Sequence, residues 1–184
     1  QFPQPSPLFA THGQGGLVWD TDGNEYVDLV SALLPNVLGY RDPDVDAAIR
    51  RQLARGISFS LATELEAELA EILCRLIPCA EMVRFGKTGS DATSAAIRLA
   101  RAYRNKTGVI IATDGYHGWH DWAVTGTSRG VGVLHDSVRR MAPDRILDRE
   151  LSHWGAVIIE PESDPAYLRE LRAACDKTGC ILIF

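Results

Sequence analysis

Residues 84–93 read Arg84-Phe85-Gly86-Lys87-Thr88-Gly89-Ser90-Asp91-Ala92-Thr93. The pattern around this stretch predicts a strand at about residues 82–85 and a helix over 90–104, joined by a small turn that contains glycine. The amides of a first helical turn lack intrahelical partners and favour an anion. Gly89 would let a phosphate approach closely, and Ser90 would add a hydroxyl donor. Two interpretations stay open, a phosphate cradle and an ordinary capped junction between a strand and a helix.

Gly86-Lys87-Thr88 also suggests a P-loop, the phosphate-binding loop of many nucleotide-binding proteins. That motif has a glycine five residues before its Gly-Lys pair, and Glu81 occupies this position. A P-loop also needs a flexible turn at residues 82–85, where we predict a strand. We therefore exclude a P-loop.

Downstream, apolar runs alternate with helical patterns, which is typical of an α/β fold with a largely parallel sheet. Further strands are predicted at residues 109–112, 156–159 and 181–184, and a further helix at 165–176. Residues 125–149 predict a loop with one short helix. The last strand ends where the sequence ends, so we expect a fragment or a protein with a further part.

Upstream, three prolines within the first eleven residues predict an extended arm. A β-hairpin is predicted over residues 16–20 and 25–29, because Gly23 allows the positive φ of a tight turn. A helix is predicted over residues 42–55, where an Asp N-cap precedes a proline. A second helix begins with a capping box at residue 63 and ends by residue 78.

The composition excludes several classes of protein. The chain has 184 residues, of which 46% are hydrophobic and 23% are charged, as expected for a globular domain with a buried core. Its net charge is −5 and it has no basic block, which argues against a nucleic-acid partner. No apolar run reaches the roughly 18 residues of a membrane span, and the start does not resemble a signal peptide.

The four cysteines form two C-x4-C pairs, Cys74 with Cys79 and Cys175 with Cys180. Zinc knuckles and redox motifs have a two-residue spacing instead. We therefore predict reduced, buried thiols and a cytoplasmic setting.

Two further candidate segments follow predicted strands. In residues 115–122, Tyr116 or His117 can stack on a flat heteroaromatic ligand. The alternatives for this segment are plain packing of the aromatic rings and a metal site built from His117, His120 and Asp121. Glu160 ends the strand at 156–159, and open α/β sheets bind ligands at such carboxyl ends. A solvated edge residue is the alternative interpretation for Glu160.

Taken together, these motifs resemble the class III aminotransferases, which are pyridoxal-phosphate enzymes of fold type I, and within them the glutamate-1-semialdehyde aminomutases and their relatives. The matching motifs occur in family order, at residues 16–26, 38–43, 63–66, 82–100, 115–118 and 160–161 and in the final strand. The resemblance implies an α/β fold with the largely parallel sheet of the large domain, plus an amino-terminal hairpin and helix segment. Residues 1–62 would form the arm, hairpin and helix, and residues 63–184 the first part of the domain that binds pyridoxal phosphate.

The resemblance also implies a site for pyridoxal 5′-phosphate. Thr88, Gly89 and Ser90 lie at the phosphate-binding positions of the family's Ser-Gly-Thr-Glu-Ala stretch. Tyr116 would stack on the pyridine ring, and His117 is the second candidate for contact with the cofactor. Glu160 would be a catalytic residue near the ring or the substrate.

Two of the family's catalytic residues have no match in the sequence. The Schiff-base lysine lies well downstream in the family and does not match Lys87, Lys106 or Lys177. The aspartate that pairs with the pyridine nitrogen would be the residue after Phe184. The resemblance therefore covers an amino-terminal half.

The implied activity is amino-group transfer through an external aldimine, as a transaminase or an aminomutase. The expected partners are a small-molecule amino donor, a keto or aldehyde acceptor and a second copy of the chain in a homodimer, without nucleic acid or membrane. Leu33 stands where the aminomutase has an aromatic residue in its pocket, which argues against the semialdehyde substrate. The alternatives are an inactive fragment or binding module of the same fold, and a generic phosphate-binding α/β domain.

Overall fold

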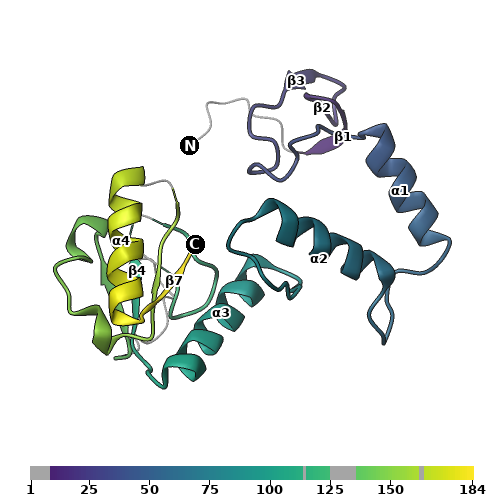
Figure 1. Ribbon diagram of the computed structural model, residues 1–184. Helices are drawn as coiled ribbons and strands as arrows, with labels where there is room; N and C mark the ends of the chain where they lie inside the picture. The colour runs from purple at the N-terminus through teal and green to yellow at the C-terminus, as the bar shows by residue number, and fades with distance from the viewer. Residues whose placement is uncertain (1–8, 114, 125–135, 162–163) are drawn as a thin grey trace. The chain divides into compact units, whose positions relative to one another are not determined.

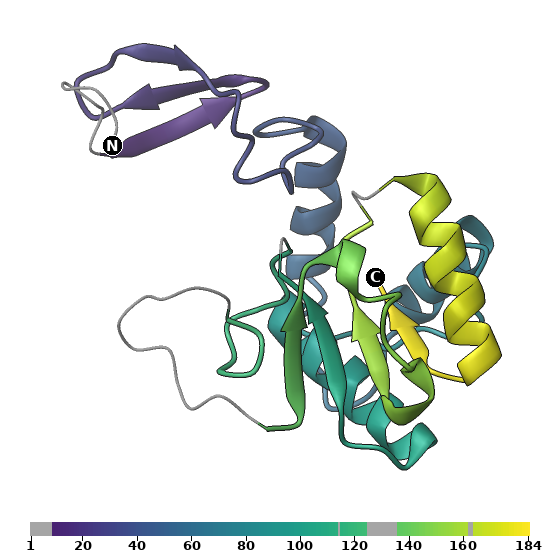
Figure 2. The same cartoon turned by 90° about the vertical axis from the view of Figure 1, so that its left-hand side faces the viewer.

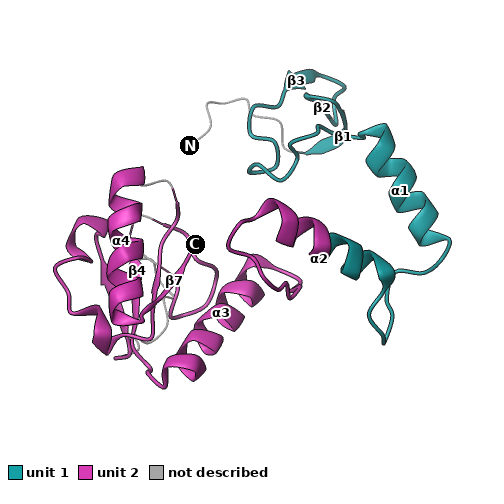
Figure 3. Ribbon diagram, in the orientation of Figure 1, with its two compact units in different colours: residues 1–69 teal, residues 70–184 magenta. Residues whose placement is uncertain are grey.

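The computed structural model of the chain describes residues 9–113, 115–124, 136–161 and 164–184 (Figure 1). It divides into two compact units, residues 1–69 and residues 70–184 (Figure 3). The division falls inside the helix α2 (Glu64–Leu76). The expected domain boundary between residues 62 and 63 stays a prediction. Among the described helices, none is long and apolar enough to span a membrane.

Unit 1 contains an antiparallel sheet with the order β1 (Ala10–Gln14), β2 (Leu17–Asp20) and β3 (Glu25–Val27). The predicted hairpin is confirmed, because Trp19 pairs with Glu25 and Leu17 with Val27. β1 was not predicted, since its sequence Ala-Thr-His-Gly-Gln has no apolar alternation. Its pairing with β2 forms the strand, and the rest of the predicted arm, residues 1–8, lies outside the described residues.

The carboxylate of Asp20 holds the hairpin turn. Its Oδ1 accepts the backbone N–H groups of Asp22 and Asn24, each at 2.9 Å. Its Oδ2 accepts from the Asn24 side-chain amide at 3.0 Å and from the Tyr26 hydroxyl at 2.8 Å. The bonds from Asn24 and Tyr26 outweigh desolvation and hold the pKa of Asp20 at about 2. A buried carboxylate therefore specifies this turn.

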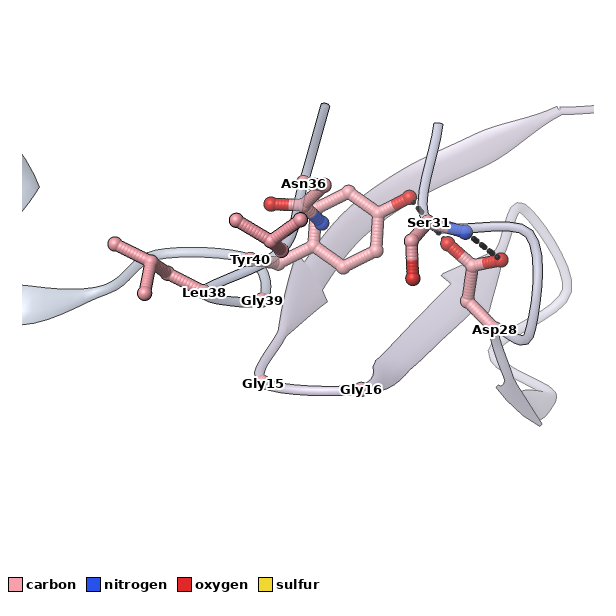
Figure 4. Close-up of a pocket in the computed structure, with 9 residues that line it drawn as sticks. Gly15, Gly16, Asp28, Ser31, Asn36, Leu38, Gly39 and Tyr40 are labelled. Atoms are coloured by element: carbon pink, nitrogen blue, oxygen red, sulfur yellow. Dashed lines mark hydrogen bonds between the residues drawn. The ribbon is translucent and has the colours of Figure 1, made fainter. Parts of the chain in front are cut away.

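A second carboxylate, Asp28, holds the segment after β3. Its Oδ2 accepts the Tyr40 hydroxyl at 2.7 Å, a bond that lowers the pKa of Asp28 (Figure 4). The backbones of Tyr40 and Gly15 exchange two hydrogen bonds of 2.8 Å. Gly39 has a φ of +82°, and a Cβ there would lie 2.8 Å from the Gly15 carbonyl oxygen, so glycine is required. These contacts border a hollow of about 300 Å³.

The two predicted amino-terminal helices are confirmed. α1 (Pro43–Leu53) has Asp42 as its N-cap, whose carboxylate accepts the amides of Asp44 at 3.1 Å and Val45 at 3.0 Å. At the start of α2, the Glu66 carboxylate accepts the Thr63 amide at 2.8 Å, which is one half of the predicted capping box.

Unit 2 contains a four-stranded sheet, with α3 (Gly89–Arg104) and α4 (Pro165–Thr178) packed against it. All neighbouring strands are parallel, and their order is β5-β4-β6-β7 (Figure 2). The strands are β4 (Val109–Ala112), β5 (Val138–Met141), β6 (Ala156–Ile158) and β7 (Ile181–Ile183). The predicted parallel α/β sheet is confirmed.

Alternating side chains of the central strands fill two separate cores. On one face, Ile110 of β4 packs in a cluster that contains Leu171 of α4. On the other face, Ile111 packs in a cluster that contains Ile97 of α3. Since successive side chains of a strand point to opposite faces, the two helices cover opposite sides of the sheet. Both faces of β4 are buried, which explains its continuous apolar sequence.

Three predictions for unit 2 are wrong. Of the four thiols predicted to be buried, Cys79 is exposed and Cys74 is half-buried, whereas Cys175 and Cys180 are buried. Residues 82–85 form no strand, because no described strand pairs with them, and Met82 is 89% exposed. The case against a P-loop therefore depends on Glu81 alone. Within residues 125–149, the loop prediction missed β5, while the short helix is the 3₁₀ turn Pro143–Arg145. Residues 125–135 of that stretch lie outside the described residues.

Candidate functional site

A hollow of about 560 Å³ lies at the N-terminus of α3, where the segment after β4 crosses the helix end. All of its lining belongs to unit 2 and consists of Thr88, Ser90, Tyr116, Trp119 and His120. Three of these five residues, Thr88, Ser90 and Tyr116, were predicted as site residues from the sequence. The structure thus brings the two strongest sequence signals together.

A capping box fixes the end of α3. The Thr88 hydroxyl accepts the Asp91 amide at 3.2 Å and donates to Asp91 Oδ2 at 3.0 Å, and the Thr88 amide donates to the same carboxylate oxygen at 3.0 Å. The Thr88 hydroxyl is therefore engaged within the helix cap. The amides of Gly89 and Ser90 precede the first intrahelical bonds and stay available to a ligand.

Gly89 faces open space. A Cβ built at this position has no neighbouring atom within 4 Å, and the φ of Gly89 is not positive. Neither packing nor backbone conformation within the described residues therefore requires glycine here. The absence of a side chain instead leaves room for an anionic group close to the first helical turn.

The loop after β4 is attached to α3 through Ser90. The Trp119 amide donates to Ser90 Oγ at 3.1 Å, and Thr93 Oγ1 donates to the His117 carbonyl at 2.9 Å. Gly118 has a φ of +114°, and a Cβ there would lie 2.9 Å from Ser90 Oγ, so the close approach depends on glycine. Among the described residues, the Ser90 hydroxyl donates to no acceptor, which leaves its proton for a ligand.

Tyr116 and Glu160 join the ends of two neighbouring strands. The Tyr116 amide, after β4, donates to Glu160 Oε1, after β6, at 2.8 Å. The Tyr116 ring is 69% exposed and lines the hollow. A Cβ at Gly115 would lie 3.2 Å from Glu160 Cγ, so this glycine allows the carboxylate to approach. Glu160 therefore holds the backbone that carries the aromatic ring.

The structure places His117 away from the hollow. Its side chain is 5% exposed and lies against Gly115, where an added Cβ would be 2.9 Å from Nε2. Trp119, which is 80% exposed, and His120 line the hollow instead. The sequence signal for this arrangement is Gly118. Its positive φ changes the direction of the chain between the buried His117 and the exposed Trp119. A contact between His117 and a cofactor stays a prediction.

His120 has partners of its own. Its Nε2 lies 2.7 Å from the Ser90 carbonyl oxygen and 3.0 Å from Ser94 Oγ. Its ring stacks on Trp122 with the centroids 5.4 Å apart. Within the described ranges, no group of three or more His, Cys, Asp or Glu side chains could hold a metal ion.

Comparison with known proteins identifies the family. The family model for aminotransferase class III matches residues 3–147. The chain is 38% identical to 3-aminobutyryl-CoA aminotransferase of Cloacimonas acidaminovorans, over 99% of this chain and 48% of that protein. It is 37% identical to glutamate-1-semialdehyde 2,1-aminomutase of Desulfosudis oleivorans, over 97% of this chain and 48% of that protein. The chain spans about half the length of the curated relatives that it matches.

Solved structures agree with this assignment. An omega-transaminase from Sphaerobacter thermophilus superimposes with a TM-score of 0.89 at 30% identity, over 100% of this chain and 49% of that one. A transaminase with PLP bound has a TM-score of 0.87 at 25% identity, over 98% of this chain and 49% of that one. The resemblance inferred from the motifs is confirmed, as is the fold type I architecture. The chain belongs to the class III aminotransferase family.

Proposed function

We propose that this chain forms the part of a pyridoxal-phosphate-dependent enzyme that binds the cofactor phosphate and one face of its ring, for amino-group transfer. The observation that carries the proposal is the hollow at the N-terminus of α3. There, Ser90 and the exposed ring of Tyr116 line one space, and Gly89, the residue between Thr88 and Ser90, has no atom within 4 Å of its Cβ position. Membership of the class III family supports the choice of cofactor.

The residues of the hollow fit a phosphorylated aromatic ring. The helix end supplies free amides and a favourable dipole for the phosphate. The two nearby carboxylates are engaged elsewhere, Asp91 in the helix cap and Glu160 with the Tyr116 amide. The rings of Tyr116 and Trp119 give the flat surface that a heteroaromatic ligand needs. The volume of about 560 Å³ lies within the usual range of small-molecule sites.

Each residue then has a defined task. When bound, pyridoxal phosphate supplies an electron sink that stabilises negative charge on a substrate carbon. Ser90 donates its hydroxyl proton to the phosphate, while the amides of Gly89 and Ser90 complete the cradle. Tyr116 covers one face of the ring. Glu160 acts as a positioning residue, since it holds the Tyr116 backbone, and Thr88 caps the helix that presents the amides.

For the substrates of the whole protein, we propose only chemical classes. An aminotransferase moves an amino group from an amino donor to a keto or aldehyde acceptor, and we propose these classes as the substrates of the whole protein. We also propose residues 1–62 as an amino-terminal segment and residues 63–184 as the first part of the cofactor domain. The homodimer and the cytoplasmic setting stay predictions.

The test uses the full-length protein and pyridoxal phosphate. We expect saturable binding in equilibrium dialysis, one phosphopyridoxyl adduct per chain in the intact mass after borohydride reduction, and transfer of an amino group between an amino acid and a keto acid. Pyridoxal without phosphate should bind more weakly, because it leaves the cradle empty. A protein that binds neither compound saturably would disprove the proposal.

A further inference from the structure

The contacts of His120 point to a role beyond lining the hollow. Nε2 lies 2.7 Å from the Ser90 carbonyl oxygen, which can only accept a hydrogen bond. Nε2 therefore carries the proton and donates it to Ser90, with Ser94 Oγ as a second acceptor at 3.0 Å. The bond joins the loop after β4 to the first turn of α3, at the residue that offers both an amide and a hydroxyl to a ligand.

Two contacts fix Ser90 from the same loop. The Trp119 amide holds the hydroxyl oxygen at 3.1 Å, and the adjacent His120 ring holds the carbonyl oxygen. The Ser90 carbonyl already lies in α3 and also accepts the Thr93 hydroxyl at 3.2 Å, so the bond from His120 fixes the loop to the helix. The loop then holds the Trp119 amide against Ser90 Oγ, which restricts rotation of the Ser90 side chain. The hydroxyl proton is then directed before a ligand arrives, which lowers the entropic cost of binding.

The ring of His120 is itself supported from behind. It stacks on Trp122 at an interplanar angle of 11°, and the turn after His120 is closed by bonds from Ala123 and Val124 to its carbonyl, at 2.9 and 2.8 Å. Arg140 of β5 donates to the carbonyls of Trp122 at 3.0 Å and Val124 at 2.7 Å. A side chain of the sheet thus anchors the turn that carries His120.

We infer that His120 is a positioning residue for the cofactor phosphate, acting through Ser90 by its Nε2–H bond to the Ser90 carbonyl. The inference depends on the proposed function, since it assumes that the phosphate binds at Ser90. It predicts that loss of the donor weakens binding of a phosphorylated ligand and leaves its unphosphorylated counterpart unaffected. A purely structural role for the histidine would weaken both.

The experiment separates the donor of His120 from its ring. His120→Phe keeps a ring to stack on Trp122 and removes the donor, whereas His120→Gln keeps an N–H donor and removes the ring. His153→Phe is the matched control, because His153 is an exposed histidine of the same unit. Dissociation constants for pyridoxal phosphate and for pyridoxal are measured with each full-length protein.

For His120→Phe we expect the dissociation constant of pyridoxal phosphate to rise about tenfold, while that of pyridoxal stays within about twofold. His120→Gln should stay within about threefold of wild type for both ligands, and His153→Phe should match wild type. An equal loss for both ligands, or a larger loss in His120→Gln than in His120→Phe, would overturn the inference. Wild-type protein that binds no pyridoxal phosphate would instead disprove the proposed function.

A second measurement needs no variant that might misfold. Inorganic phosphate is titrated into the wild-type protein with ¹⁵N-labelled histidine, before the cofactor is added. Since the phosphate binds next to Ser90, we expect the Nε2 resonance of His120 to shift and that of His153 to stay in place. A titration that moves neither resonance, although the same concentration of phosphate weakens the later binding of the cofactor, would overturn the inference.

Discussion

The two units of the chain are stabilised in different ways. Unit 2 buries apolar side chains on both faces of its sheet, and Ile110, Ile111 and Leu171 are 0% exposed. In unit 1, Asp20 is the only described residue that is buried. Its sheet and the following segment are instead ordered by carboxylates that accept several hydrogen bonds. Polar networks therefore shape unit 1, whereas a hydrophobic core shapes unit 2 and supports the site.

The largest expected effect comes from the core of unit 2. Leu171→Ala should destabilise the full-length protein by about 2 to 5 kcal/mol, because it removes a fully buried side chain and leaves a cavity. Leu29→Ala in unit 1, where the leucine is 89% exposed, is the matched control and should change stability by less than about 0.5 kcal/mol. Urea unfolding measures both. Equal losses would contradict the difference between the units.

Two glycine variants distinguish effects on the stability of unit 2 from effects on ligand binding. Gly118→Ala should cost about 1 to 3 kcal/mol, since it combines a φ of +114° with a Cβ 2.9 Å from Ser90 Oγ. Gly89→Ala should leave stability within about 1 kcal/mol of wild type, because its Cβ enters open space. The same methyl group should still weaken binding of pyridoxal phosphate. Thermal melts and dialysis test the pair, and unchanged binding in Gly89→Ala would contradict the cradle.

Ser90→Ala and Tyr116→Ala should weaken retention of the cofactor more than they weaken folding. Ser90→Ala removes a hydrogen bond to a charged group, which contributes about 1.5 to 3 kcal/mol. Tyr116→Ala removes a ring that is 69% exposed and so contributes little to the core. Tyr116→Phe is the control and should retain the cofactor. Unchanged affinity in both alanine variants would argue against this placement of the site.

The smallest effect should be confined to the hairpin of unit 1 and should depend on pH. The pKa of Asp20 in the folded state is about 2, below its ordinary value of 3.8, so its contribution to stability is present above pH 3.8 and is lost as the pH falls towards 2. Hydrogen exchange of the Asn24 amide should accelerate over this range. Asp20→Ala should remove the protection already at neutral pH. Asp22→Ala, in the same turn, should leave it unchanged.

The sequence predicted the helix ends and turns that are formed by residues close together in the chain. The Asp42 N-cap and the Gly23 turn each depend on hydrogen bonds between residues that are only a few positions apart. Strand pairing is not local, which explains the errors. β5 contains two adjacent arginines and still forms a strand because β4 supplies its partner, whereas residues 82–85 have the right composition and no described partner.

The candidate site, like the fold, was predicted from the sequence only in part. Ser90 and Tyr116 could be found because the carboxyl ends of parallel strands and the helix N-terminus meet at one edge. Thr88 was predicted only from the resemblance to the family. Which of the next side chains enters the hollow depends on a single backbone angle at Gly118. Sequence alone does not give that angle, so Trp119 was not predicted to line the hollow, and the predicted contact of His117 with a cofactor stays a prediction.

The bond between Glu160 and the Tyr116 amide has a consequence for protein engineering. It fixes the loop through the main chain, so the anchor is independent of which side chain stands at position 116. The ring at this position can therefore be exchanged for another aromatic group without redesign of its support. A library at position 116 with Glu160 kept constant would explore how ring identity tunes the enzyme, while the geometry of the loop is inherited unchanged.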